Sequence, residues 1–142
     1  MMRVIDYKTG RLDKGKEKLS LESIESIFDP KHISDHSHYF LQGILYCCIL
    51  DSQAFPEMLF VQHLKKDGYT PLLAIGKQPV MDVEEYKEEF MERLQNLVAE
   101  ITSKSTQGAE AFPPTGKDNN QCKNCSYAAL CTTTTTHGTD EE

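Results

Sequence analysis

Two side chains near the start of the chain, Asp6 and Lys8, are of the types that hydrolyse phosphodiesters. A carboxylate can hold a divalent metal, which neutralises phosphate charge and lowers the pKa of a bound water, and a nearby ammonium can orient that water or stabilise developing charge. Alternate side chains of a strand point to one side, so both groups would face one pocket. Tyr7 would face the other side, with its backbone carbonyl free to lean towards the metal. The same triplet is also typical of an ordinary surface ion pair.

The elements that must position this pair are a strand and a helix. Residues 3–7 are predicted to form a strand, because apolar residues precede a Thr-Gly turn. Residues 38–50 are apolar around nearly the whole helical circumference, which predicts a buried helix. Gln42 and Tyr46 stand four apart and share one face of it. A buried glutamine amide needs partners, which a phosphate or sugar could supply, as could a backbone group in the core.

Basic residues are concentrated just after the predicted strand. Five of them lie between residues 8 and 18, against Asp13 and Glu17. Such a surplus could sit over phosphates, although charge alone equally fits a solvated loop. The net charge of -7 argues against a general electrostatic grip on nucleic acid. Residues 1–81 carry ten acidic and ten basic residues, so the whole excess of negative charge lies in residues 82–142. The basic residues that are candidates for contacting DNA are Lys8, Arg11 and Lys14.

Three cysteines near the C-terminus, Cys122, Cys125 and Cys131, are spaced C-x2-C-x5-C. Thiolates at this spacing can bind zinc or an iron-sulfur cluster. His137 could complete a zinc site, but its threonine-rich surroundings speak against that. The pair at 47–48 falls inside the predicted buried helix and is expected to be part of the core.

Composition limits the class of protein. At 142 residues and 39% hydrophobic content, the chain is long enough for one domain with a core. It has no run of about 18 uncharged apolar residues and no signal-peptide core, so no membrane association is expected. An odd number of cysteines without a secretory signal predicts reduced thiols or metal ligands, and a cytoplasmic protein.

Four further segments complete the expected organisation. A short helix is predicted at residues 20–28, and a hairpin that extends the sheet is predicted at residues 55–64 and 69–75. Asp82 is expected to cap a long amphipathic helix that ends near Ser103, with Glu85 completing a capping box. The sequence KHISDHSH between the first two helices is expected to be an exposed loop, although its histidines with Asp35 could in principle bind a metal.

The pair of motifs IDYKTG and QGILY resembles the RecB-type branch of the PD-(D/E)XK nuclease superfamily. Its members carry D-Y-K-T at the end of a core strand and Q-x-x-x-Y on the next core helix. The resemblance implies that Asp6 binds Mg²⁺ or Mn²⁺, together with the Tyr7 carbonyl, and that Lys8 is the catalytic lysine. It places Gln42 and Tyr46 near the DNA backbone. The segment LSLESIESIFDP also resembles an insert of AddB-like helicase-nuclease subunits, so the likeness runs from Arg3 to Cys131.

The same resemblance implies a role for the cysteines. In AddB-like nucleases a similar C-terminal group follows an approach like FPPT, here residues 112–115, and joins a distant upstream cysteine to hold a [4Fe-4S] cluster. Three of those four ligands are visible in this sequence. The implied partners are DNA and a helicase or helicase-nuclease subunit, and the implied activity is exonuclease cleavage during recombination and double-strand-break repair.

The expected fold is α/β, the C-terminal part of a restriction-endonuclease-like core, with a small mixed sheet flanked by helices. Residues 1–111 would form the partial nuclease core, residues 112–131 the cysteine motif, and residues 132–142 a disordered tail. A full site needs another acid on a preceding strand, so the chain is expected to be a fragment with little or no nuclease activity. The sheet edge exposed in this way could lead to self-association. The alternatives are a non-catalytic DNA- or partner-binding module with a cysteine-bound metal, and an interaction domain with coincidental motifs.

Overall fold

The computed structural model describes residues 1–12, 18–50, 53–107 and Ser126. The chain divides into two compact units, residues 1–99 and 100–142. The elements that position the candidate site all belong to the first unit. No helix in the described ranges combines the length and apolarity that a membrane span requires.

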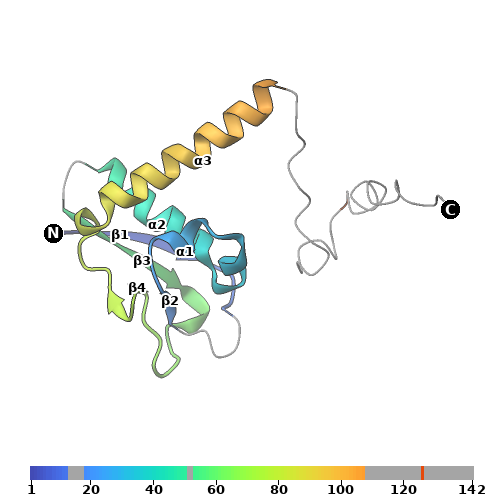
Figure 1. Cartoon of the computed structure of the whole chain (residues 1–142). Helices are drawn as coiled ribbons and strands as arrows, with labels where there is room; N and C mark the ends of the chain where they lie inside the picture. The colour runs from blue at the N-terminus through green and yellow to red at the C-terminus, as the bar shows by residue number, and fades with distance from the viewer. Residues whose placement is uncertain (13–17, 51–52, 108–125, 127–142) are drawn as a thin grey trace. The chain divides into compact units, whose positions relative to one another are not determined.

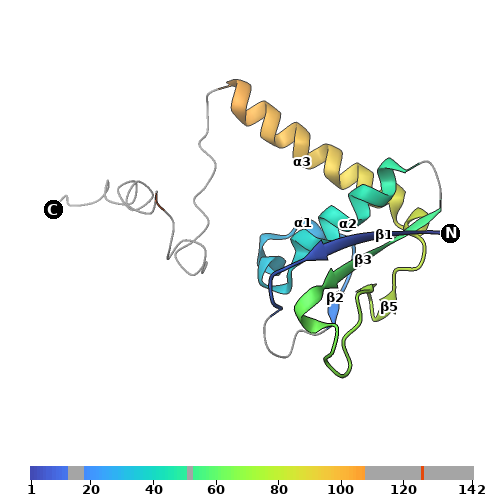
Figure 2. The same ribbon diagram turned by 180° about the vertical axis from the view of Figure 1, so that it is seen from behind.

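Two parallel strands form the centre of the first unit. β1 (Met2–Lys8) pairs with β3 (Ala54–Phe60) over its whole length, with Asp6 opposite Met58 and Lys8 opposite Phe60. α2 (Ser37–Ile49) connects them, as a parallel pair requires a crossover. Both views show β1 beside β3, with α1 (Glu25–Phe28) and α2 on the same side of the two strands (Figures 1 and 2). The predicted strand at residues 3–7 and the predicted helix at 38–50 are thus confirmed.

The burial of α2 differs from the prediction. Phe40 and Ile44 are fully buried against the strands, whereas Tyr46 and Ile49 are exposed by 42% and 71%. The helix is therefore buried on one side only, and the apolar residues on its other side reach the surface. Gln42 lies at the boundary between the two sides, where its side chain is partly buried.

A second sheet, of three short strands, lies beyond β3. It consists of β2 (Leu19–Leu21), β4 (Leu73–Ile75) and β5 (Gln78–Pro79), with β2 parallel and β5 antiparallel to β4. The turn between β4 and β5 contains Gly76 and Lys77, both with positive φ. One antiparallel bridge, Glu57 to Leu72, links β3 to this sheet. The mixed α/β arrangement with small sheets and flanking helices is the predicted one.

Two of the predicted elements are wrong in detail. The hairpin of residues 55–64 and 69–75 does not form, because β3 makes its ladder with β1 and β4 makes its ladders with β2 and β5. The start of the predicted helix at residues 20–28 is strand β2, because Leu19 and Leu21 are buried on either side of exposed Ser20, a period of two. Only its end, α1, is helical.

The remaining helices also begin or end at other residues than predicted. The segment expected to be a loop contains the 3₁₀ helix η1 (Pro30–Asp35), and 3₁₀ helix η2 (Val61–His63) follows β3. The Asp82 carboxylate caps the 3₁₀ helix η3 (Val83–Glu85) by accepting a bond from the Glu84 amide at 3.0 Å. The long helix, α3 (Lys87–Gln107), begins after that.

Tyr69 closes the edge of β3 that faces away from β1. Its hydroxyl accepts a hydrogen bond from the Phe60 amide at 2.7 Å and donates one to the Met58 carbonyl at 2.9 Å. Burial is the main cause that raises the pKa of Tyr69, so the phenol stays protonated and can donate. One side chain thus satisfies two backbone groups that a further strand would otherwise bind.

Replacing Tyr69 by Phe is expected to lower the free energy of unfolding by about 1–3 kcal/mol, because it leaves one buried amide and one carbonyl unpaired. Tyr7→Phe is the matched control, since the Tyr7 side chain is 66% exposed. Chemical denaturation monitored by circular dichroism measures both variants. Equal stability of the two variants would contradict this role of the hydroxyl.

Gly43 lets α2 pack closely against the strands. A Cβ built on Gly43 would lie 2.9 Å from Pro56 Cβ, 2.8 Å from Met58 Cε and 3.3 Å from Leu73 Cδ1. The proline ring cannot move aside as a flexible side chain would. The absence of a side chain at Gly43 therefore determines how closely α2, and with it Gln42, approaches β1 and β3.

Gly43→Ala is expected to destabilise the fold by about 1–3 kcal/mol, because the added methyl forces the helix away from the strands. Gly10→Ala is the control, since nothing lies within 4 Å of its added Cβ. Thermal melts of both variants give the comparison. If the Gly43→Ala protein were as stable as the control, the space between α2 and β3 would accommodate a methyl group, which would contradict the close packing at Gly43.

Candidate active site

Asp6 and Lys8 lie side by side on β1, on the face that α2 covers. Lys8 Nζ is 3.0 Å from Asp6 Oδ2, and the two side chains are 19% and 18% exposed. The residue between them, Tyr7, points to the other face. Strand geometry alone requires this alternation. The partial burial, in contrast, is a tertiary effect. It strengthens the attraction between the two charges relative to the same pair in water.

A chain of hydrogen bonds extends from Lys8 onto α2. Lys8 Nζ donates to Gln42 Oε1 at 2.6 Å, and Gln42 Nε2 donates to the Tyr46 hydroxyl at 2.9 Å. The lysine can only donate, so the amide must turn its oxygen to Lys8 and its nitrogen to Tyr46. Both polar atoms of Gln42 therefore bind protein groups. Gln42 orients the ammonium, and the Tyr46 hydroxyl in turn orients Gln42.

An aromatic ring forms a further side of the lysine pocket. Lys8 Nζ lies 5.0 Å from the centre of the Tyr39 ring. At this distance the ring face attracts a cation. The ammonium is thus held by a carboxylate, an amide oxygen and a ring, which come from β1 and α2.

The carboxylate of Asp6 is held by charge attraction more than by a hydrogen bond. Its Oδ2 atom is buried and has no aligned hydrogen-bond donor, although Lys8 Nζ is close enough for an ion pair. The distance shows an ion pair, and the alignment falls short of a hydrogen bond.

One copy of the described chain does not provide a complete metal site. Among residues 1–12, 18–50 and 53–107, no three histidine, cysteine or carboxylate side chains group closely enough to hold a metal ion. Asp6 and the backbone carbonyl of Tyr7 supply one carboxylate and one carbonyl, whereas Mg²⁺ is bound by several oxygen ligands, including waters. The donors present in a single copy therefore do not fit a fully held divalent metal.

The turn after β1 is tied to η2. Gln62 Nε2 donates to the Thr9 carbonyl at 2.7 Å, and Gln62 Oε1 accepts from Arg11 Nε. The Leu12 amide donates to His63 Nε2 at 3.1 Å, and the His63 side chain is almost wholly buried. These contacts hold the exposed guanidinium of Arg11 just beyond the Asp6–Lys8 pair in sequence. Lys14 lies outside the described residues.

The arrangement of Asp6 and Lys8 on a strand beneath Gln42 and Tyr46 on a helix agrees with what a comparison with known protein families finds for the chain. The sequence profile of the PD-(D/E)XK nuclease superfamily matches residues 1–132. The chain belongs to this superfamily. Its mixed α/β architecture is consistent with the restriction-endonuclease-like fold of PD-(D/E)XK proteins. Nucleases of the superfamily act on DNA and generally use Mg²⁺ or Mn²⁺. No curated protein and no solved structure matches the chain.

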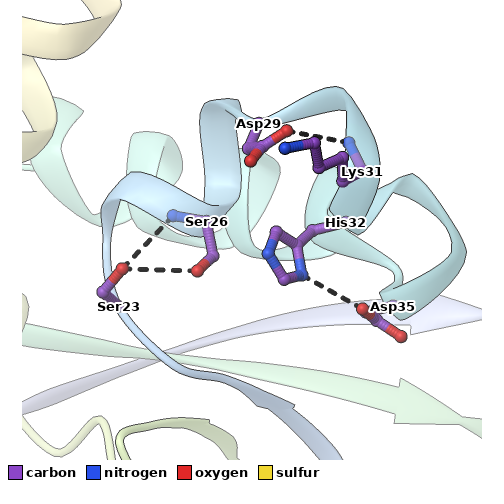
Figure 3. A network of polar contacts seen from close by, with 6 residues as sticks. All are labelled: Ser23, Ser26, Asp29, Lys31, His32 and Asp35. Atoms are coloured by element: carbon purple, nitrogen blue, oxygen red, sulfur yellow. Dashed lines mark hydrogen bonds and ion pairs between the residues drawn. The ribbon is translucent and has the colours of Figure 1, made fainter.

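The histidines of this PD-(D/E)XK chain form no metal site among the described residues. His32 Nδ1 lies 3.1 Å from Asp35 Oδ2, next to the cap in which Asp29 accepts from the Lys31 amide (Figure 3). Figure 3 also shows Ser23 bonded to Ser26 at the start of α1. These contacts give the segment a structural role.

Two other histidines contact the Tyr39 ring that faces Lys8, His36 in a stacked and His38 in a tilted arrangement. The rings of His36 and His38 lie 5.5 Å and 4.0 Å from that of Tyr39. Burial first, then the charges of His36 and Lys8, lower the pKa of His38. His38 is therefore neutral at neutral pH and adds no charge beside the ammonium.

The described cysteines behave as core residues. Burial raises the pKa of Cys47 to about 12 and also raises that of Cys48. Both thiols stay protonated at neutral pH, which is unfavourable for metal binding. The predicted ligands Cys122, Cys125 and Cys131 lie outside the described residues, as do residues 112–115 and the predicted tail at 132–142.

Three residues that hold this PD-(D/E)XK site were not singled out from the sequence: Tyr39, Gln62 and His63. Tyr39 contacts the lysine from the first turns of α2, and the other two contact the turn after β1 from about fifty residues away. No local spacing signals such contacts. The sequence itself carries no sign of them, because the burial of His63 and the exposure of Gln62 are known only from the structure.

Replacing Gln42 by Leu is expected to free Lys8 and to increase its rate of acetylation about threefold or more, because the ammonium loses a partly buried acceptor. Tyr46→Phe should have a smaller effect, since the Lys8–Gln42 bond remains. Competitive labelling of the lysines, read by mass spectrometry, measures both. Gln95→Leu on the exposed face of α3 is the control. Unchanged Lys8 labelling in Gln42→Leu would show that Gln42 does not hold the ammonium.

Proposed function

We propose that this chain carries the lysine-bearing part of a metal-dependent DNA exonuclease site. The observation that carries the proposal is the continuous contact from Asp6 through Lys8 and Gln42 to Tyr46. Membership of the PD-(D/E)XK superfamily supports nuclease chemistry. The motif pair IDYKTG and QGILY supports the RecB-type branch, and with it an AddB-like helicase-nuclease of recombination and double-strand-break repair in the cytoplasm.

Each residue has a distinct role in this proposal. The ammonium of Lys8 faces the scissile phosphate and stabilises the negative charge that develops there. Asp6 offers the buried Oδ2 as a metal ligand, and the Tyr7 carbonyl is a second oxygen donor. Gln42 and Tyr46 position the lysine beside the DNA backbone. Arg11, with Lys14 following it in sequence, neutralises neighbouring phosphates.

The cysteine motif is the second part of the proposal. Cys122, Cys125 and Cys131 have a spacing suited to a [4Fe-4S] cluster or to zinc. A cluster in the complete protein would need a fourth ligand, and a helicase subunit would deliver the DNA end.

A non-catalytic DNA-binding module is the second candidate function. The observation that favours it is that no three metal-ligating side chains come together in the described ranges. A single copy is accordingly proposed to cut DNA little or not at all. Metal-dependent cleavage that Asp6→Asn abolishes would favour the enzyme, and DNA binding that Asp6→Asn leaves intact without any cleavage would favour the module.

Arg11→Ala is expected to weaken binding of a short linear duplex and to reduce the slope of log affinity against log salt by about 0.9, the value for one phosphate contact. Lys8→Ala should act in the same direction. Fluorescence anisotropy over a series of salt concentrations measures both. Lys87→Ala is the control, because that lysine pairs with Glu84 at the start of α3. If Arg11→Ala and Lys8→Ala kept the wild-type slope as the control does, the proposed DNA-binding surface would be wrong.

A further inference from the structure

A hollow of about 360 Å³ opens on the outer face of the second sheet, apart from the Asp6–Lys8 pair. Ser20, Ala74 and Pro79 line it from three neighbouring strands. They lie in register across the sheet, and residues opposite each other in a ladder share a face. The residues of β2 and β4 that alternate with them are buried in the core. The volume is within the range of pockets that bind small ligands.

The lining of the hollow combines an apolar floor with positive charge. Leu72, Ala74 and Pro79 supply apolar surface, and one serine and one threonine add hydroxyl groups. Lys18 and Lys77 also line the hollow and are exposed to solvent. No carboxylate is among the described lining residues, although the chain carries a net charge of -7. The hollow therefore suits a ligand that joins negative charge to an apolar body.

We propose that this hollow binds one unpaired nucleotide of a DNA strand, with the base on the apolar floor and the flanking phosphates at Lys18 and Lys77. The inference rests on the proposed DNA exonuclease function, to which it adds a separate strand-binding site. A nucleotide has both parts of the required ligand, because every base has a π face and every linkage carries one negative charge. The two hydroxyls can donate to or accept from the edge of any base.

The size of the floor favours a single nucleotide over a larger partner. Ser20 and Pro79 lie two strand spacings apart, about 10 Å, and Leu72 and Ala74 lie about 7 Å apart along the chain. A helix of a protein partner, about 10–12 Å in diameter, is wider than this floor. The bases of a duplex are stacked and paired, so only an unpaired base can turn its face to the floor.

One end of the hollow lies at the same end of the strands as Lys8. The bridge between Glu57 and Leu72 is antiparallel, so β2 and β4 begin where β1 and β3 end. Lys18 directly precedes β2 and lies at that end. Both views show η2 at the end of β3, next to the start of β2 (Figures 1 and 2).

The segment from η2 to β4 joins the candidate active site to the hollow. Arg11 is bound to η2. Exposed Lys65 and Lys66 follow that helix, against the single acid Asp67, and the segment then reaches Thr70, which lines the hollow. A single strand that passes round the end of β3 would therefore meet mainly basic residues between the candidate site and the hollow. This continuity favours DNA over an acidic peptide as the ligand.

The salt dependence of single-strand binding tests the two lysines. Lys18→Gln and Lys77→Asn are each expected to reduce the slope of log affinity against log salt by about 0.7 for a labelled oligothymidine, because each removes one phosphate contact. Asparagine suits position 77, where φ is 73°. Lys87→Gln is the control, because it removes the same charge from a lysine that pairs with Glu84. Fluorescence anisotropy in EDTA measures all variants without metal-dependent cleavage. Wild-type slopes for Lys18→Gln and Lys77→Asn would overturn the inference.

Abasic DNA and a substitution in the floor test the base-binding part. A strand of equal length without bases should bind about threefold or more weakly than oligothymidine, because it leaves the apolar floor uncovered. Ala74→Glu should weaken oligothymidine binding about tenfold, and Ala74→Gln should weaken it less, since only glutamate sets a carboxylate beside the two lysines. Equal affinity for abasic DNA and oligothymidine would overturn the site for a base. Equal losses on a blunt duplex would overturn the preference for an unpaired nucleotide.

These measurements separate the hollow from the proposed nuclease surface. The hollow is tested on single strands, whereas the slopes of Lys8→Ala and Arg11→Ala are measured on a duplex. If only Lys18→Gln and Lys77→Asn changed their slopes, the strand-binding site would stand and the proposed nuclease surface would fail. If only Lys8→Ala and Arg11→Ala did so, the hollow would be overturned and the nuclease proposal would stand.

Discussion

The hydrogen bond between Lys8 and Gln42 is the contact on which the candidate site depends, because it joins two elements that are 34 residues apart in sequence. It can form only if α2 crosses β1 and β3 at close range. Gly43, next to Gln42, permits that approach by having no side chain against Pro56. The parallel ladder then places Lys8 beneath the amide, since Lys8 and the buried Phe60 are in register on the helix-covered face. Packing in the core thus decides the position of the ammonium.

The electrostatic balance of the site follows from this placement. A partly buried ammonium loses some hydration, and the Asp6 carboxylate, the Gln42 oxygen and the Tyr39 ring compensate for it. The neighbouring His38 stays neutral at neutral pH, so it does not repel the lysine. One carboxylate for one ammonium leaves the pocket near neutrality. A phosphodiester and a divalent metal together would therefore need further anionic oxygen.

The two edges of the central strand pair are treated differently. On the β3 side, the Tyr69 hydroxyl and the bridge to Leu72 satisfy the backbone groups. On the β1 side, the described residues provide no equivalent cover. An unpaired edge presents backbone groups that a further strand can bind. Because Asp6 and Lys8 are on that same strand, a strand bound there would lie beside the site.

The sequence by itself determined what depends on near neighbours. It predicted the strand of Asp6 and Lys8, the helix of Gln42 and Tyr46, and the shared side of each pair, because spacings of two and four residues set directions within one element. It did not predict which strands pair, because strand pairing depends on contacts between segments that are distant in sequence. In place of the expected hairpin, β3 pairs in parallel with β1. Only the tertiary structure brought the two pairs into contact and added Tyr39, Gln62 and His63. Such contacts arise where elements distant in sequence pack together, and local periodicity does not predict them.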